Sequence, residues 1–201
     1  MITLLLALTM GTGQPDPLLG VRDPQLRTLA QTELRAAVQK GLPTAPLIAK
    51  TLEGQLKQAP APRIAMALKA LTARMELVKT KLGSATEPEL VAGADALAAG
   101  VSPDALAALR RMWPERSIAL PIGVLTELVT RGVEPKLATR EVINLLNRRA
   151  TPQQLIQLGY DVSNDVRRGQ GAHAALDVRV RGLMGSLLPA PAGSTAIPAR
   201  P

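Results

Sequence analysis

Apolar residues recur at intervals of three and four along most of the chain, which is the spacing of one buried face of an α-helix. The clearest stripe has spacings of 4, 3, 4, 3 and 4 and consists of Ile64, Leu68, Leu71, Met75, Val78 and Leu82. Basic residues lie off this stripe, and Gly83 follows it directly. The pattern predicts an amphipathic helix that ends at Gly83.

Similar apolar stretches follow a row of prolines, each standing where a helix would begin. These prolines are Pro24, Pro43, Pro62, Pro88, Pro103, Pro121, Pro135 and Pro152. Proline is favoured in the first helical turn because a backbone N–H has no partner within the helix at that position, so the lack of one costs nothing. Thr86 and Thr151 also open sequences typical of capping boxes. The row predicts eight helices, the last of which is expected to end at Gly159.

Three of the turns between these stretches share one pattern, at residues 38–43, 97–103 and 129–135. An apolar residue, two spacers, Gly and an apolar residue are followed by Pro, which is typical of a tight connection between helices. Two units take about 32 residues, close to the period of helical hairpins that stack into solenoids. We therefore expect an all-α fold, an array of about eight short helices that is either solenoid-like or an irregular bundle.

The chain divides into five predicted segments. Residues 1–13 resemble a secretory signal peptide, with an uncharged apolar run before small residues, although no basic residue precedes the run and a buried first helix is the alternative. Residues 14–22 are predicted to be a linker, and residues 23–159 a helical repeat-like domain. Residues 160–188 are predicted to form a basic C-terminal extension, and residues 189–201, rich in Pro, Ala and Gly, a disordered tail.

The secondary structure of the C-terminal extension has two interpretations. Residues 176–181 alternate between apolar and polar positions, as a half-buried strand does. Leu176, Val180, Leu183 and Leu187 are instead spaced 4, 3 and 4 apart, as on one face of a helix. No second convincing strand is present to pair with the first, so we expect a helix.

The composition restricts the possible chemistry. The chain of 201 residues has no Cys and no Phe, and it has one Trp, one Tyr and one His. Thiolate catalysis and cysteine-ligated zinc sites are excluded, and a catalytic triad would require His173, which lies in a glycine-rich segment. No Walker A loop is present. We expect no enzymatic activity, no cofactor and no metal site; a peptidoglycan-acting enzyme with two helical carboxylates is a less favoured alternative.

The charge suggests where a partner would bind. The formal net charge is +8, which favours acidic partners. The candidate partner-binding residues are Arg167, Arg168, Arg179, Arg181, Trp113, Arg110 and Arg111. Trp113 has a second interpretation, as a plug in the aliphatic core. Arg148 and Arg149 are expected to interact with the carbonyl groups at a helix C-terminus.

Together these features predict a non-catalytic exported scaffold or interaction protein, located in the periplasm as a component of an envelope or membrane-associated assembly. The expected partner is another protein, with an anionic envelope surface or lipid headgroups as further possibilities. The alternative is a cytoplasmic protein associated with nucleic acid, which the scarcity of aromatic residues disfavours. No transmembrane helix is expected, because the apolar run at residues 2–10 is too short to span a bilayer.

Overall fold

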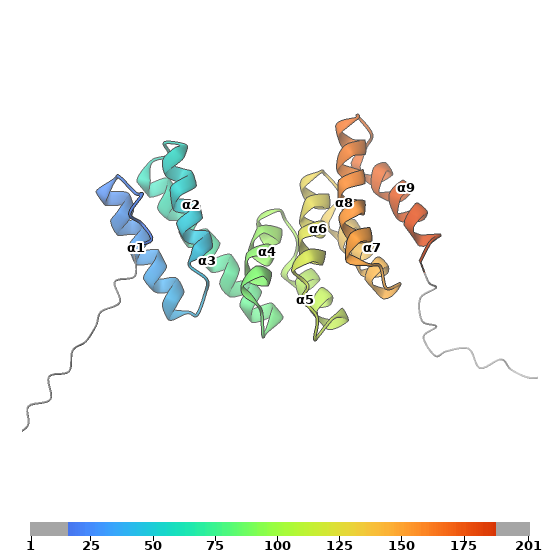
Figure 1. Ribbon diagram of the computed structural model, residues 1–201, viewed down its shortest axis with the longest axis horizontal. Coiled ribbons are helices and arrows are strands. Elements are labelled where there is room, and N and C mark those ends of the chain that lie inside the picture. The colour runs from blue at the N-terminus through green and yellow to red at the C-terminus, as the bar shows by residue number, and fades with distance from the viewer. Residues whose placement is uncertain (1–15, 188–201) are drawn as a thin grey trace, which may run out of the picture.

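The computed structural model describes residues 16–187, and within this range α-helices are the only regular secondary structure (Figure 1). The helices are α1 (Pro24–Gln39), α2 (Ala45–Leu56), α3 (Ala61–Leu82), α4 (Glu87–Ala98), α5 (Pro103–Met112), α6 (Ala119–Thr130), α7 (Pro135–Asn147), α8 (Pro152–Arg167) and α9 (Ala172–Met184). The all-α prediction is confirmed, with nine helices in the described range. None of these nine is both long and apolar enough to cross a membrane.

The helices form an elongated array in which helices two apart in the sequence pack against each other (Figure 1). α1, α3, α5 and α7 make one row of such contacts, and α4, α6 and α8 make another. Contacts of α3 with α4 and of α6 with α7 connect the two rows, and α9 packs against α8 at the end of the array. This packing order is that of stacked helical hairpins, in which each hairpin mainly contacts its neighbours.

Six of the helices end in the same kind of turn, with a residue in the left-handed conformation after the last helical turn. These residues are Gly41, Gln58, Gly100, Gly132, Arg149 and Gly169. In each turn, the N–H of the following residue bonds to the carbonyl oxygen five residues earlier, at 2.9 to 3.1 Å. This is the Schellman motif, which satisfies carbonyl groups at the helix end. The three turns predicted from the glycines at 41, 100 and 132 are confirmed.

The core is aliphatic, and α3 is the longest helix of residues 16–187. α3 has 22 residues and packs against α1, α2, α4 and α5. All six apolar residues of its predicted stripe are buried. Glycines allow the neighbouring helices to come close: a Cβ at Gly93 of α4 would lie 2.6 Å from Val78, and one at Gly54 of α2 would lie 2.6 Å from Ile64.

Three helix boundaries differ from those expected from the sequence. α2 begins at Ala45, so that Pro43 lies before the helix and Pro46 lies in its first turn. α6 begins at Ala119, so that Pro121 lies inside its first turn rather than at its start. The prediction that the eighth helix ends at Gly159 is wrong, because α8 continues to Arg167. Gly159 is buried in the helix and faces Val124 of α6. Val162, beyond Gly159, is also buried, so the buried face of α8 continues past Gly159.

Three apolar residues of the predicted helical stretches are exposed in the structure. Val38 is 65% exposed, Leu56 83% and Ile156 55%, so helical periodicity alone does not mark every apolar residue as buried. Each lies on the apolar face of its helix, and in each case this face is wider than the part of the helix that contacts a neighbouring helix. The width of a buried face depends on that neighbour and not on the stripe alone.

The segment before α1 packs on the helices that follow it. Within the expected linker at residues 14–22, Leu18 and Val21 are fully or almost fully buried. The Gln55 side chain of α2 accepts from the N–H of Arg22 at 2.7 Å and donates to the carbonyl of Gly20 at 2.9 Å. The predicted signal peptide at 1–13 and the predicted tail at 189–201 lie outside the described residues.

Candidate functional site

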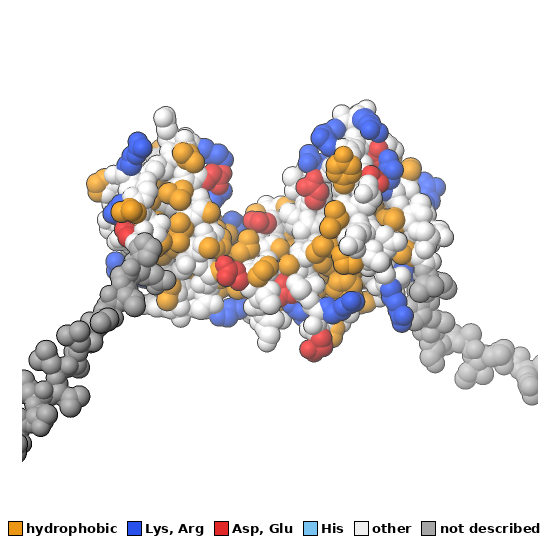
Figure 2. Space-filling view, viewed as in Figure 1, with side chains coloured by type: hydrophobic (Ala, Val, Ile, Leu, Met, Phe, Trp, Pro, Cys, Tyr) orange, Lys and Arg blue, Asp and Glu red, His pale blue; other side chains and the backbone are white. Residues whose placement is uncertain are grey.

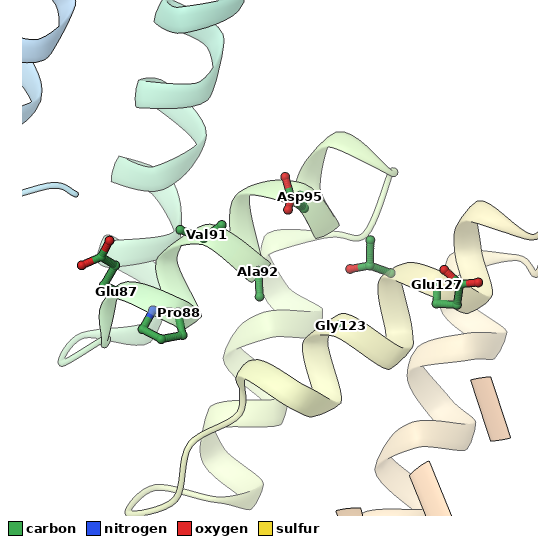
Figure 3. A pocket seen from close by; sticks show the side chains of 8 residues that line it. Glu87, Pro88, Val91, Ala92, Asp95, Gly123 and Glu127 are labelled. Carbon is green, nitrogen blue, oxygen red and sulfur yellow. The ribbon is translucent and has the colours of Figure 1, made fainter. Parts of the chain in front are cut away.

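A groove of about 680 Å³ lies between α4 and α6, as Figure 3 shows. Its apolar lining comes from Pro88, Val91 and Ala92 of α4, which line one side of that helix at spacings of three and four. α6 contributes Gly123, where a Cβ would meet no atom within 4 Å. The absence of a side chain at this position keeps the groove open. Thr126 adds a hydroxyl to the same wall.

Three carboxylates line the same groove. Glu87 lies at one end, and Asp95 and Glu127 lie towards the other (Figure 3). Figure 2 shows acidic side chains among hydrophobic ones over α4, in the low middle part of the molecule. This groove is therefore acidic although the chain carries a net charge of +8.

The three carboxylates differ in their surroundings. Glu127 accepts hydrogen bonds from Ser163 Oγ at 2.7 Å and from Arg131 Nε at 2.9 Å. The Ser163 hydrogen bond lowers the pKa of Glu127, and Arg131 adds to this effect against the opposing effect of burial. Within residues 16–187, Glu87 and Asp95 form no ion pair. Their charges are therefore available to a ligand.

The structure places Arg110 in a mostly buried ion pair instead of on a free surface. Its Nη2 atom lies 2.7 Å from Oε1 of Glu89, with 16% and 2% of the two side chains exposed. Arg110 Nη1 also donates to three carbonyls of the loop after α5, those of Trp113, Pro114 and Arg116. Arg110 thus holds the loop between α5 and α6 against the start of α4.

Glu89 is held by the backbone as well as by Arg110. Its carboxylate accepts the N–H of Ile118 and the N–H of Thr86, both at 2.9 Å. Burial alone would raise the pKa of Glu89, but these two backbone hydrogen bonds and Arg110 outweigh it and lower the pKa. The charged form is therefore the stable one in the folded protein.

The arginines of the C-terminal extension are mostly engaged with nearby polar groups. Arg179 of α9 donates from Nε and Nη2 to the two carboxylate oxygens of Asp165 in α8, at 2.7 and 2.9 Å. Arg181 pairs with Asp177 at 2.5 Å on the same helix, and Arg167 bonds to Asn164. The remaining one, Arg168, caps the C-terminus of α8 and is exposed. The sequence cluster is thus divided between two helices and partly neutralised.

The two remaining candidates, Trp113 and Arg111, lie at the end of α5. Arg111 is exposed and helps to lower the pKa of Asp104, an effect that comes mainly from the Lys81 hydrogen bond. Trp113 is half-buried and packs on the core, and the guanidinium of Arg116 lies 4.9 Å from the centre of its ring. The structure brings Trp113 together with Arg116 and the distant Arg149 in a second groove, and not with the arginines of α8 and α9.

Sequence reasoning missed the groove between α4 and α6. Glu87, Val91 and Asp95 are spaced four residues apart, so the sequence alone could have predicted that they lie on one side of a helix. Nothing in the sequence pairs that side with Gly123 and Glu127, which lie about thirty residues further on. The acidic character of the groove depends on this pairing of α4 with α6.

Between residues 16 and 187 no group of three or more His, Asp or Glu side chains is placed to hold a metal ion. His173 accepts the N–H of Glu134 through Nε2 at 3.1 Å, which ties α9 to the turn before α7. Comparison of the chain with protein-family models, with curated proteins and with solved structures found no match. The function is therefore inferred from the geometry alone.

Proposed function

We propose that this chain is a non-catalytic exported scaffold that binds another protein, and that the groove between α4 and α6 holds a basic amphipathic segment of this partner. The observation that supports the proposal is the apolar groove with carboxylates at both ends, on a chain that is otherwise strongly basic. Stacked helical hairpins commonly provide extended binding surfaces of this kind.

The groove suits an amphipathic segment because it combines two kinds of contact. Val91 and Ala92 offer apolar surface, whose burial under a partner side chain is favourable. Glu87 and Asp95 are eight residues apart on α4, which corresponds to about 12 Å along the helix. A partner segment with two Lys or Arg residues at that separation could pair them with Glu87 and Asp95, and the apolar residues between them would contact Val91 and Ala92.

An anionic partner bound through the C-terminal arginines is less well supported. Arg179 already binds Asp165 through two hydrogen bonds, and Arg181 is paired with Asp177. A nucleic acid or an anionic surface would have to compete with these carboxylates. For this reason the groove between α4 and α6, and not the arginine cluster, carries the proposed binding function.

The test uses two fluorescein-labelled amphipathic peptides, one of leucine and lysine and one of leucine and glutamate. The fluorescence anisotropy of each peptide is measured as the full-length chain is added, and we expect it to rise for the lysine peptide only. General attraction to a chain of net charge +8 would favour the glutamate peptide, so this preference would be specific to the groove.

A pair of variants tests where the peptide binds. Gly123→Leu should abolish peptide binding by filling the groove, because the added side chain points into space that no other atom occupies. Gly182→Leu in α9 is the matched control, since it also adds a side chain to a helix in open space and should bind the lysine peptide normally. Preference for the glutamate peptide, or unchanged binding by Gly123→Leu, would contradict the proposal.

Export is tested separately. The N-terminus of the protein isolated from its native cells should be determined after cell fractionation. We expect a mature chain that begins near Gln14 and is recovered outside the cytoplasm. An intact Met1 in the cytoplasmic fraction would contradict export and leave the binding function open to test.

A further inference from the structure

The second groove, near Trp113, has a different chemical character from the groove between α4 and α6. It has a volume of about 730 Å³ and lies between the loop after α5 and the turn before α8. Its walls combine Trp113 with the apolar side chains of Leu146 and Pro152, and with two guanidinium groups, those of Arg116 and Arg149. No acidic residue lines it.

The contact between Arg116 and Trp113 leaves the guanidinium able to bind a ligand. The Cζ atom of Arg116 lies over the indole ring at 4.9 Å from its centre, within the range of a cation–π contact. The N–H donors of an arginine point outward in the plane of the group, where they match the two oxygens of a carboxylate or a phosphate. Within residues 16–187 these donors have no protein acceptor, in contrast to those of Arg110, which bind Glu89.

Arg149 brings a second positive charge to the same groove from a position that usually favours glycine. Its φ of 60° is left-handed, and Gly41, Gly100, Gly132 and Gly169 occupy the corresponding position in four other turns. In the described part of the chain the Arg149 side chain has neither an ion pair nor a hydrogen bond to offset this conformation, although it was expected to serve the helix C-terminus. The helix end is satisfied by the backbone, because the N–H of Ala150 bonds to the carbonyl of Leu145.

We propose that this groove binds an oxyanion, a carboxylate or a phosphate ester, carried on an apolar or aromatic body. Arg116 and Arg149 would bind the oxyanion through charge-assisted hydrogen bonds, and Trp113, Leu146 and Pro152 would contact the body. This proposal is independent of the groove between α4 and α6, since the two grooves share no lining residue.

Trp113 is the only tryptophan of the chain, so its fluorescence reports on this groove alone. The full-length protein is titrated with phenyl phosphate, with benzoate and, as a neutral control, with benzyl alcohol. We expect a saturable change in emission with at least one of the two anions, with a Kd of about 1 mM or lower, and none with benzyl alcohol. The response to phenyl phosphate compared with benzoate distinguishes a phosphate site from a carboxylate site.

Two matched glycine variants test the role of Arg149. Arg149→Gly removes the guanidinium while keeping a residue suited to φ 60°, so the fold should be retained and the Kd of the preferred anion should rise about tenfold or more. Gln58→Gly makes the same backbone change at φ 53° in the turn after α2 and should leave the Kd unchanged. An equal response to benzyl alcohol, no saturable response to either anion, or an unchanged Kd in Arg149→Gly would overturn the proposal.

Discussion

The carboxylate of Glu89 and the guanidinium of Arg110 lie 2.7 Å apart in an ion pair in which Glu89 is buried and Arg110 is mostly buried. The pair joins the first turn of α4 to the loop between α5 and α6. Through the N–H of Ile118, Glu89 also fixes the residue that precedes α6. The start of both groove-forming helices thus depends on one carboxylate.

Replacement of Arg110 by Met should destabilise the protein strongly. It leaves the Glu89 charge buried without its cationic partner, and we expect the free energy of unfolding to fall by about 3 kcal/mol. Urea denaturation followed by circular dichroism measures this value. Arg111→Met, at the exposed neighbouring position, is the control and should change the free energy by less than about 0.5 kcal/mol. Equal effects of the two variants would show that the pair contributes little.

The stability of the protein should decrease in acid because of Glu89. Its pKa in the folded protein is below the ordinary value of 4.5, so the stabilisation is complete above about pH 4.5. It is lost as the pH falls through the lower folded-state pKa, where Glu89 becomes protonated. Unfolding curves measured at a series of pH values should therefore show a smaller loss in acid for Glu89→Gln than for the parent chain. Parallel curves for the two proteins would contradict this assignment.

Gly93→Ala tests the close approach of α3 and α4. The added Cβ would lie 2.6 Å from Val78 Cγ1, so the helices must move apart, and we expect a loss of about 1 to 3 kcal/mol. Gly123→Ala is the matched variant, because it adds the same atom to a helix in open space. It should stabilise the protein by up to about 1 kcal/mol through the higher helix propensity of Ala. Thermal unfolding should give opposite changes in Tm for the two variants.

Two substitutions at the left-handed position of a turn should change the free energy of unfolding in opposite directions. Gly132 has a φ of 95°, and Gly132→Ala should cost about 1 kcal/mol because a Cβ is disfavoured there. Arg149→Gly should raise the free energy of unfolding by a few tenths to about 1 kcal/mol, because glycine adopts this conformation without strain. Urea denaturation of both variants measures the two changes. A loss of stability in Arg149→Gly would show that the arginine side chain contributes to the fold itself.

Much of the secondary structure could be predicted because its signals are local. The Thr151 N–H bonds to the Gln154 side chain at 2.8 Å, so the capping box read from four residues of sequence forms as expected. Gly41, Gly100 and Gly132 end helices for a reason that also depends on a few residues, since glycine readily adopts the left-handed conformation. The buried stripe of α3 follows from helical periodicity in the same way.

The sequence by itself thus determined an all-helical chain, the starts of most helices and the glycine turns between them, because caps and glycine conformations depend on neighbouring residues. The tertiary structure decided which apolar residues are buried, as the exposure of Leu56 and Ile156 shows. It also decided both grooves, since Asp95 and Gly123 line one groove, and Trp113 and Arg149 the other, only when the helices stack. The physical reason is that packing against a neighbouring helix removes surface from water, and no local pattern identifies that neighbour.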